Sequence, residues 1–121
     1  MPAPPGAIGQ VMKFAGSQIG VPYVFGAESP GKAFDCSGLI QAAYASAGIK
    51  IGRDTTAQRT EGVQIPLSQI QPGDLVFPSP HHVVMYAGNG NVIAAPHTGT
   101  NVQYQPLAQF GPKVMVRRIA K

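Results

Sequence analysis

The stretch "FDCSGLI", residues 34–40, decides how the rest of this 121-residue sequence is interpreted. It contains the one cysteine of the chain, Cys36, between an aspartate and a serine. From Cys36 onward the apolar residues fall on one face of a helix, and Gly48 is of the type found just past a helix end. We therefore expect Cys36 to lie in the first turn of a helix.

A cysteine in that position has chemical consequences. Unpaired backbone N–H groups and the positive end of the helix dipole favour the thiolate, and the same N–H groups can stabilise an oxyanion. A single cysteine cannot form an internal disulfide, and the sequence has no Cys/His spacing of the zinc type. Cys36 is thus either the nucleophile of an acyl-transfer site or a small core residue, and the helix alone leaves both open.

Composition limits the classes of function. At 121 residues and 44% hydrophobic, the chain has the size of a single domain spanning residues 1–121. The net charge is +4, but only 12% of residues are charged and no basic stripe is interleaved with stacking aromatics, so we expect no nucleic-acid partner. An anionic cell wall or membrane surface fits the charge equally well. No feature requires a metal or another cofactor, and we expect a monomer.

Targeting signals are also informative. No stretch approaches the ~20 apolar residues of a membrane span. The first twenty residues have no charged leader before an apolar run, so they do not read as a secretory signal peptide. The expectation is either an intracellular protein or a domain excised from a longer chain.

The first half of the chain is helical by pattern. Apolar residues recur at helical spacing over residues 8–19, after two prolines, Pro4 and Pro5, that suit a helix start. The residues "AESPGKAF" carry loop signals and lead into the Cys36 helix. Further on, "RDTTAQRTEG" offers Asp54 or Thr55 as the N-cap of one or two helical turns.

The second half changes to short β-prone runs. The tetrapeptide "GNGN", residues 88–91, predicts a tight hairpin between neighbouring strands. Helices first and strands second predict an α+β fold with a small antiparallel sheet. The expected strands are residues 63–65, 74–77, 82–87, 91–95, 101–104 and 114–118.

A general base is needed if Cys36 is a nucleophile, and His82 is the strongest candidate. Strand alternation places His82, Val84 and Tyr86 on one face, so that His81 is expected to face away. A histidine at the start of a strand can be held toward a neighbouring helix end, although strand-end histidines are commonly surface residues. The residues alone leave both alternatives open.

Four motifs in order resolve this choice by resemblance. "GVPYVFG", "FDCSGLI", "QPGDLVF" and "HHVVMYAGNGNVIAAPHTG" are similar to the successive motifs of the NlpC/p60 family of bacterial cell-wall cysteine peptidases, over about residues 8–118. The resemblance implies a papain-like α+β fold with the N-terminal helices packed on the sheet. It also implies hydrolysis of peptidoglycan stem peptides, typically between γ-D-glutamyl and a diamino acid such as meso-diaminopimelate.

The resemblance also assigns roles by position. Cys36 matches the family nucleophile and His82 its general base. The substrate-binding positions match Tyr23, whose hydroxyl lines the site, Asp35 and Ser37, which orient the turn and contact the D-glutamyl amine and carboxylate, and Arg53 near the groove. For Tyr23 and Arg53 a structural role, a ring packed under the loop and a guanidinium that anchors it, is an equal alternative.

One position departs from the family pattern. About twelve residues beyond the base the family has a polar residue that accepts the imidazole N–H, and this chain has Ala94. Either another group, such as His97, a backbone carbonyl or a water, orients His82 at some cost in rate, or the site is degenerate. The joint presence of Cys36, His82, Tyr23 and Asp35 favours an active enzyme.

We therefore predict a cysteine endopeptidase that hydrolyses peptidoglycan. The first alternative is a catalytically weak wall-binding or structural module, and the second is an acyltransferase or amidase on the same fold. The predicted partners are stem peptides, and the predicted place of action is the cell wall or the extracellular space, reached by a secreted or virion-borne parent protein.

Overall fold

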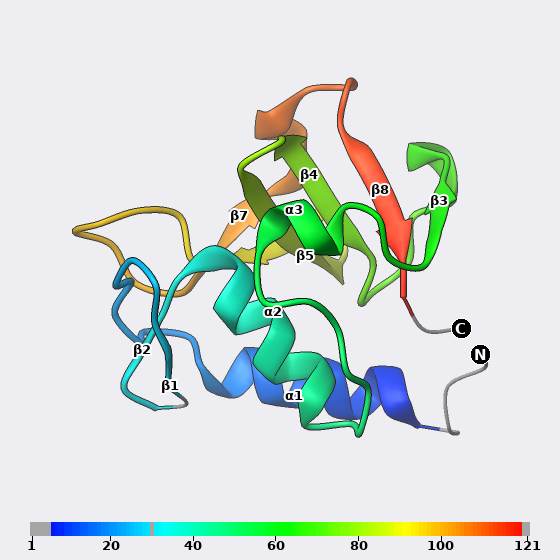
Figure 1. Ribbon diagram of the computed structural model, residues 1–121. Helices are drawn as coiled ribbons and strands as arrows, with labels where there is room; N and C mark the ends of the chain where they lie inside the picture. Colours follow the sequence, from blue (N-terminus) through cyan, green and yellow to red (C-terminus); the bar gives the residue numbers. More distant parts are fainter. Residues whose placement is uncertain (1–5, 30, 120–121) are drawn as a thin grey trace.

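A computed structural model of the chain describes residues 6–29 and 31–119 (Figure 1). Helix α2, Cys36–Ala45, begins at the residue that the sequence predicts. Helix α1, Ala7–Ser17, lies against it, and α3 is a single turn, Thr55–Gln58. The expected helix start at Pro4 and Pro5 lies outside the described residues. No helix in residues 6–29 and 31–119 is long and apolar enough to cross a membrane.

Six antiparallel strands form the main sheet in the order β3-β8-β4-β5-β6-β7. Two 3-10 turns, Leu67–Gln69 and Leu107–Phe110, connect strands. The segment expected to be a loop before Cys36 instead contains a two-stranded hairpin, β1 (Glu28–Ser29) and β2 (Ala33–Phe34). The strands of the main sheet are β3 (Val63–Ile65), β4 (Leu75–Ser79), β5 (His82–Gly88), β6 (Asn91–Ala94), β7 (Gln103–Pro106) and β8 (Met115–Arg118).

The turn between β5 and β6 confirms the predicted hairpin. Gly88 pairs with Asn91, and the two residues between them have positive φ angles of 55° at Asn89 and 79° at Gly90. A two-residue turn with both φ angles positive matches the right-handed twist of the flanking strands, which is why Asn-Gly is favoured there.

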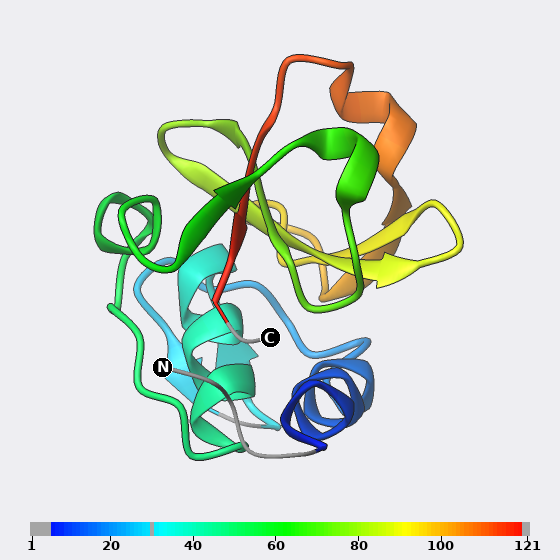
Figure 2. The same cartoon turned by 90° about the vertical axis from the view of Figure 1, so that its right-hand side faces the viewer.

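The two faces of the sheet carry separate apolar clusters. Helices α1 and α2 lie together on one side of the sheet (Figure 2), where Val83 and Met85 of β5 pack in one cluster with Leu39 and Ile40 of α2. Val84 lies in the cluster on the opposite face, together with side chains from β4, β6 and β8. The alternation that the sequence predicts for β5 is therefore confirmed, and the helix side receives its odd-numbered residues.

The expected α+β class is confirmed, with α1 and α2 packed on one face of an antiparallel sheet (Figure 2). Tyr44, fully buried on α2, donates a hydrogen bond of 2.5 Å from its hydroxyl to the carbonyl oxygen of Gly73, just before β4. Burial, followed by the nearby negative charge of Asp74, raises the pKa of Tyr44, so the hydroxyl remains a donor. This bond ties the Cys36 helix to the sheet.

Replacing Tyr44 with phenylalanine tests that tie. Tyr44→Phe leaves the Gly73 carbonyl without this donor in a buried site, which we expect to lower the free energy of unfolding by about 1–3 kcal/mol. Urea unfolding followed by circular dichroism measures the loss. Tyr104→Phe is the control, because Tyr104 is 55% exposed, and its effect should stay within about 0.5 kcal/mol. Equal stability of the two variants would contradict the proposed tie.

Candidate active site

A cavity of about 480 Å³ opens at the start of α2. It brings together segments that are distant in the sequence. Its lining includes Tyr23 from the segment before β1, Cys36 and Ser37 from α2, Arg53 and Thr55 from around α3, and His81. Cys36 is partly buried, with a free thiol. The nucleophile and the four substrate-binding residues that the sequence assigns, Tyr23, Asp35, Ser37 and Arg53, thus all line one cavity.

Asp35 fixes the start of α2. Its backbone is extended, with φ −93° and ψ −179°, and its side-chain Oδ1 accepts a hydrogen bond of 2.7 Å from the N–H of Gly38. The second oxygen, Oδ2, accepts one of 3.0 Å from the N–H of Gly26. Asp35 is therefore both the N-cap of α2 and the link to the loop that carries Tyr23. The N–H groups of Cys36 and Ser37, in the first turn, have no carbonyl one turn earlier to bind and are suited to an oxyanion.

Arg53 holds Asp35 from the other side. The guanidinium Nη1 and Nη2 atoms donate to the two carboxylate oxygens of Asp35, each at 3.1 Å. Nη1 also donates to the Ser37 hydroxyl at 3.1 Å, and Nε lies 2.8 Å from Oε2 of Glu28. All three guanidinium nitrogens thus bind protein oxygens. Burial opposes the charge of Arg53, but the hydrogen bonds to Asp35 and the charge of Glu28 outweigh it and raise the pKa of the guanidinium.

These contacts bear on the roles expected for the three polar residues. Asp35 and Ser37 are buried, at 8% and 5% exposed, and their side-chain oxygens face Arg53 and each other. The arrangement is that of an anchor for the start of α2. Direct contact of Asp35, Ser37 or Arg53 with substrate stays a prediction.

Tyr23 reaches the cavity from a short backbone bridge to Phe34. Burial is the largest cause that raises the pKa of its phenol, and the neighbouring Cys36 and Asp35 charges add to it. The hydroxyl therefore remains protonated and is available as a hydrogen-bond donor at the edge of the cavity.

Thr55 is a site residue that the sequence interpretation placed only as a helix cap. Its Oγ1 lies 3.9 Å from the Cys36 sulfur, within hydrogen-bonding range for sulfur, and the residue is 7% exposed. Asp54 is instead the N-cap of α3, because its side chain accepts a hydrogen bond of 2.8 Å from the N–H of Ala57. No local pattern could have paired Thr55 with Cys36, because 19 positions separate them.

The two adjacent histidines take different positions. His81 lies in the turn between β4 and β5 and lines the Cys36 cavity. The expectation that His81 faces away is therefore wrong, because a turn residue does not follow strand alternation. His82 begins β5 and lies against Phe110, with ring centroids 6.4 Å apart. Among the described residues, the recorded hydrogen-bond partner of the Cys36 sulfur is Thr55, so the structure does not join His82 to the thiol directly.

His82 is neutral at neutral pH, the state that a general base requires. Burial is the larger cause that lowers the pKa of His82 below its usual 6.5, and the charge of His97 adds to it. His97 follows the end of β6 and is exposed, with Nδ1 3.0 Å from the Thr98 carbonyl oxygen.

Ala94, the position that departs from the family pattern, is 1% exposed. It lies in the apolar cluster with Val84, on the face of the sheet opposite the helices.

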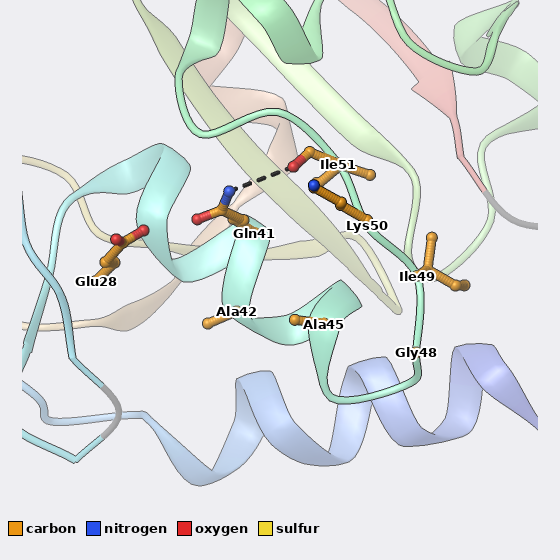
Figure 3. A pocket seen from close by; sticks show the side chains of 8 residues that line it. All are labelled: Glu28, Gln41, Ala42, Ala45, Gly48, Ile49, Lys50 and Ile51. Atoms are coloured by element: carbon orange, nitrogen blue, oxygen red, sulfur yellow. Dashed lines mark hydrogen bonds between the residues drawn. The ribbon is translucent and has the colours of Figure 1, made fainter.

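A second cavity, of about 410 Å³, has Glu28 in its lining. Figure 3 shows its side chains along α2 and the segment after it, with Glu28 at one end, Ile49 at the other and a hydrogen bond from Gln41 to the Ile51 carbonyl. Its described lining contains neither a thiol nor a histidine. The cavity around Cys36, which has both, is therefore the candidate active site.

A helix that packs on an antiparallel sheet and carries a partly buried thiol at its capped N-terminus is the arrangement of papain-like cysteine hydrolases. The chain belongs to the NlpC/P60 family, whose model matches residues 20–119.

Comparison with individual proteins agrees with the family. The chain is 38% identical to the peptidoglycan endopeptidase RipA of Mycolicibacterium smegmatis, over 93% of the chain and 26% of that protein. It is 41% identical to the γ-D-glutamyl-L-lysine dipeptidyl-peptidase of Bacillus cereus, over 74% of the chain and 28% of that protein. The chain thus spans about a quarter of the length of these two relatives. A solved NlpC/P60 protein from Bacillus cereus superimposes with a TM-score of 0.88 at 32% identity, covering 99% of this chain and 42% of that one.

Gly38 offers a test of how tightly the start of α2 is held. A Cβ at Gly38 would overlap the Ala27 carbonyl oxygen and lie 2.8 Å from Oδ1 of Asp35, so the cap would have to shift. We expect Gly38→Ala to lower the free energy of unfolding by about 1–3 kcal/mol. In urea unfolding the matched control is Gly9→Ala in α1, where nothing lies within 4 Å, and this variant should gain up to about 1 kcal/mol. A Gly38→Ala protein as stable as the native chain would show that the cap is not closely packed.

Proposed function

We propose that this chain is the catalytic domain of a peptidoglycan hydrolase, a cysteine endopeptidase that cleaves stem peptides at the bond between γ-D-glutamyl and a diamino acid. The observation that carries the proposal is the Cys36 thiol at the capped start of α2, in a cavity, in a chain of the NlpC/P60 family. The names of the relatives support the choice of substrate, because one is a peptidoglycan endopeptidase and another a γ-D-glutamyl-L-lysine dipeptidyl-peptidase. The same names support action at the cell wall.

The proposed mechanism is acyl transfer through a thioester. The histidine takes the proton of the Cys36 thiol, and the resulting thiolate attacks the γ-glutamyl carbonyl carbon. The free N–H groups at the start of α2 stabilise the oxyanion. Cleavage of the C–N bond releases the diamino acid amine, which takes its proton from the histidine. Water then hydrolyses the thioester, with the histidine accepting the water proton and returning a proton to the sulfur.

We assign the general base to His82. It matches the family position, and its neutral ring at neutral pH is the form that accepts a proton. Catalytic hydrogen bonds in unliganded sites are commonly long and tighten only when substrate binds, so an open Cys36–His82 pair is compatible with this role. His81 is the second candidate, because it lines the Cys36 cavity.

We further assign Arg53 to positioning. Its three guanidinium nitrogens are engaged with Asp35, Ser37, Glu28 and the Ala27 carbonyl, which leaves substrate contact to the exposed face of the cavity. Tyr23 and the exposed Phe25, which is 86% exposed at the edge of the cavity, are better placed to meet a peptide.

The test is cleavage of L-Ala-γ-D-Glu-meso-diaminopimelate and of its L-lysine counterpart, detected by mass spectrometry. We expect the native chain to release the dipeptide from at least one of them, and Cys36→Ala to release none. Cleavage that persists in Cys36→Ala would remove Cys36 as the nucleophile. Turnover of thioesters or lipids, with none of either peptide, would favour the acyltransferase alternative.

Ala94 requires its own variants. Ala94→His and Ala94→Glu restore polar groups of the kind that the family has at this position, and an unfolding curve for each checks that the buried apolar site accepts them. We expect the native chain to be active and a folded Ala94→His variant to be faster, because the added group can orient His82. An inactive native chain with an active Ala94 variant would instead identify a silenced, wall-binding module.

A further inference from the structure

The contact between Thr55 and Cys36 is a feature that the mechanism above does not use. The Thr55 Oγ1 lies 3.9 Å from the Cys36 sulfur, and Thr55 is buried while its neighbour Thr56 is exposed. Packing alone would explain why the methyl group of a threonine is buried here. A hydroxyl within reach of the sulfur adds a polar interaction that packing does not require.

The residues around Thr55 hold it at a fixed place against α2. Two positions before it, Arg53 forms the paired hydrogen bonds to Asp35. Three positions after it, the fully buried Gln58 donates from Nε2 to the Ser37 carbonyl oxygen at 3.0 Å and to the Gly52 carbonyl oxygen at 2.9 Å. The segment that carries Thr55 is therefore tied to the start of α2 on both sides of Thr55.

We propose that Thr55 is a positioning residue whose hydroxyl donates a hydrogen bond to the Cys36 thiolate and holds the sulfur in place for attack. A thiolate has no proton, so the hydroxyl is the donor whenever the sulfur is charged. Hydrogen bonding to the charged form of a group favours that form. The inference deepens the proposed function and rests on it for the role of Cys36 as the nucleophile.

Other charged and titratable groups line the same cavity as the sulfur, and the test has to separate Thr55 from them. They come from every element around the cavity, namely Tyr23, Asp35, Arg53, Asp54 and His81, with Glu28 behind Arg53. A change at Thr55 leaves all of these charges in place. The variants below therefore alter one hydroxyl without altering the surrounding charge.

The experiment is alkylation of the full chain by iodoacetamide from pH 5 to pH 10, followed by intact-protein mass spectrometry. Cys36 is the single cysteine, and thiolates react with iodoacetamide much faster than amines do, so the first adduct reports on it. Thr55→Val keeps the shape and removes the hydroxyl, and Thr55→Ser keeps the hydroxyl. Thr60→Val is the matched control, because Thr60 is exposed and its hydroxyl bonds to the Ala57 carbonyl oxygen, away from the sulfur.

We expect the pH midpoint of alkylation to rise by about one unit in Thr55→Val, as for the loss of one hydrogen bond to a charged group, with the same plateau rate at high pH. Thr55→Ser and Thr60→Val should keep the native midpoint. Thr55→Ala should show the same rise and serves if the valine variant does not fold. An unchanged midpoint in the folded valine or alanine variant would overturn the proposal, as would an equal rise in Thr55→Ser. No peptide is needed, so a failure of peptide cleavage cannot be mistaken for a failure of this inference.

Discussion

The ion pair between Arg53 and Asp35 is the interaction on which the rest of the site depends. Asp35 is the N-cap of α2 and also binds the N–H of Gly26, so one carboxylate joins the helix to the preceding loop. Arg53 adds the segment that leads into α3 through two parallel hydrogen bonds of 3.1 Å. Such paired hydrogen bonds fix direction as well as distance. Three separate segments are thereby held around the Cys36 sulfur.

The turn between β4 and β5 determines where the two adjacent histidines lie. The strands β4 and β5 are joined by a two-residue turn, which brings His81 to the cavity and leaves His82 as the first residue of β5. Val83 and Met85 then pack against the helices, while Val84 packs on the opposite face. The turn thus separates two adjacent histidines, because His81 lies in the turn and His82 in the strand, and with them the two candidates for the base.

Features encoded in local sequence could be predicted, and features that depend on long-range contacts could not. The helix beginning at Cys36, the Asn89–Gly90 turn and the alternation of β5 follow from capping, turn chemistry and apolar period. The β1–β2 hairpin was missed because its strands have two residues each, too few for any period. His81 was misplaced because the turn boundary falls between two identical residues. Thr55 was missed as a neighbour of the thiol because only the folded chain brings the two together.

The measurement that tests the central claim most directly is covalent capture of the nucleophile. The probe is L-Ala-γ-D-Glu with a chloromethyl ketone in place of the scissile amide, and intact-protein mass spectrometry follows adduct formation on the native, His81→Ala and His82→Ala chains. The account predicts an adduct on Cys36 that forms at a similar rate in His81→Ala and at least about a hundredfold more slowly in His82→Ala, the range of a lost general base. A native rate in His82→Ala, with the slow reaction found in His81→Ala instead, would contradict the account and move the base to the histidine that lines the cavity.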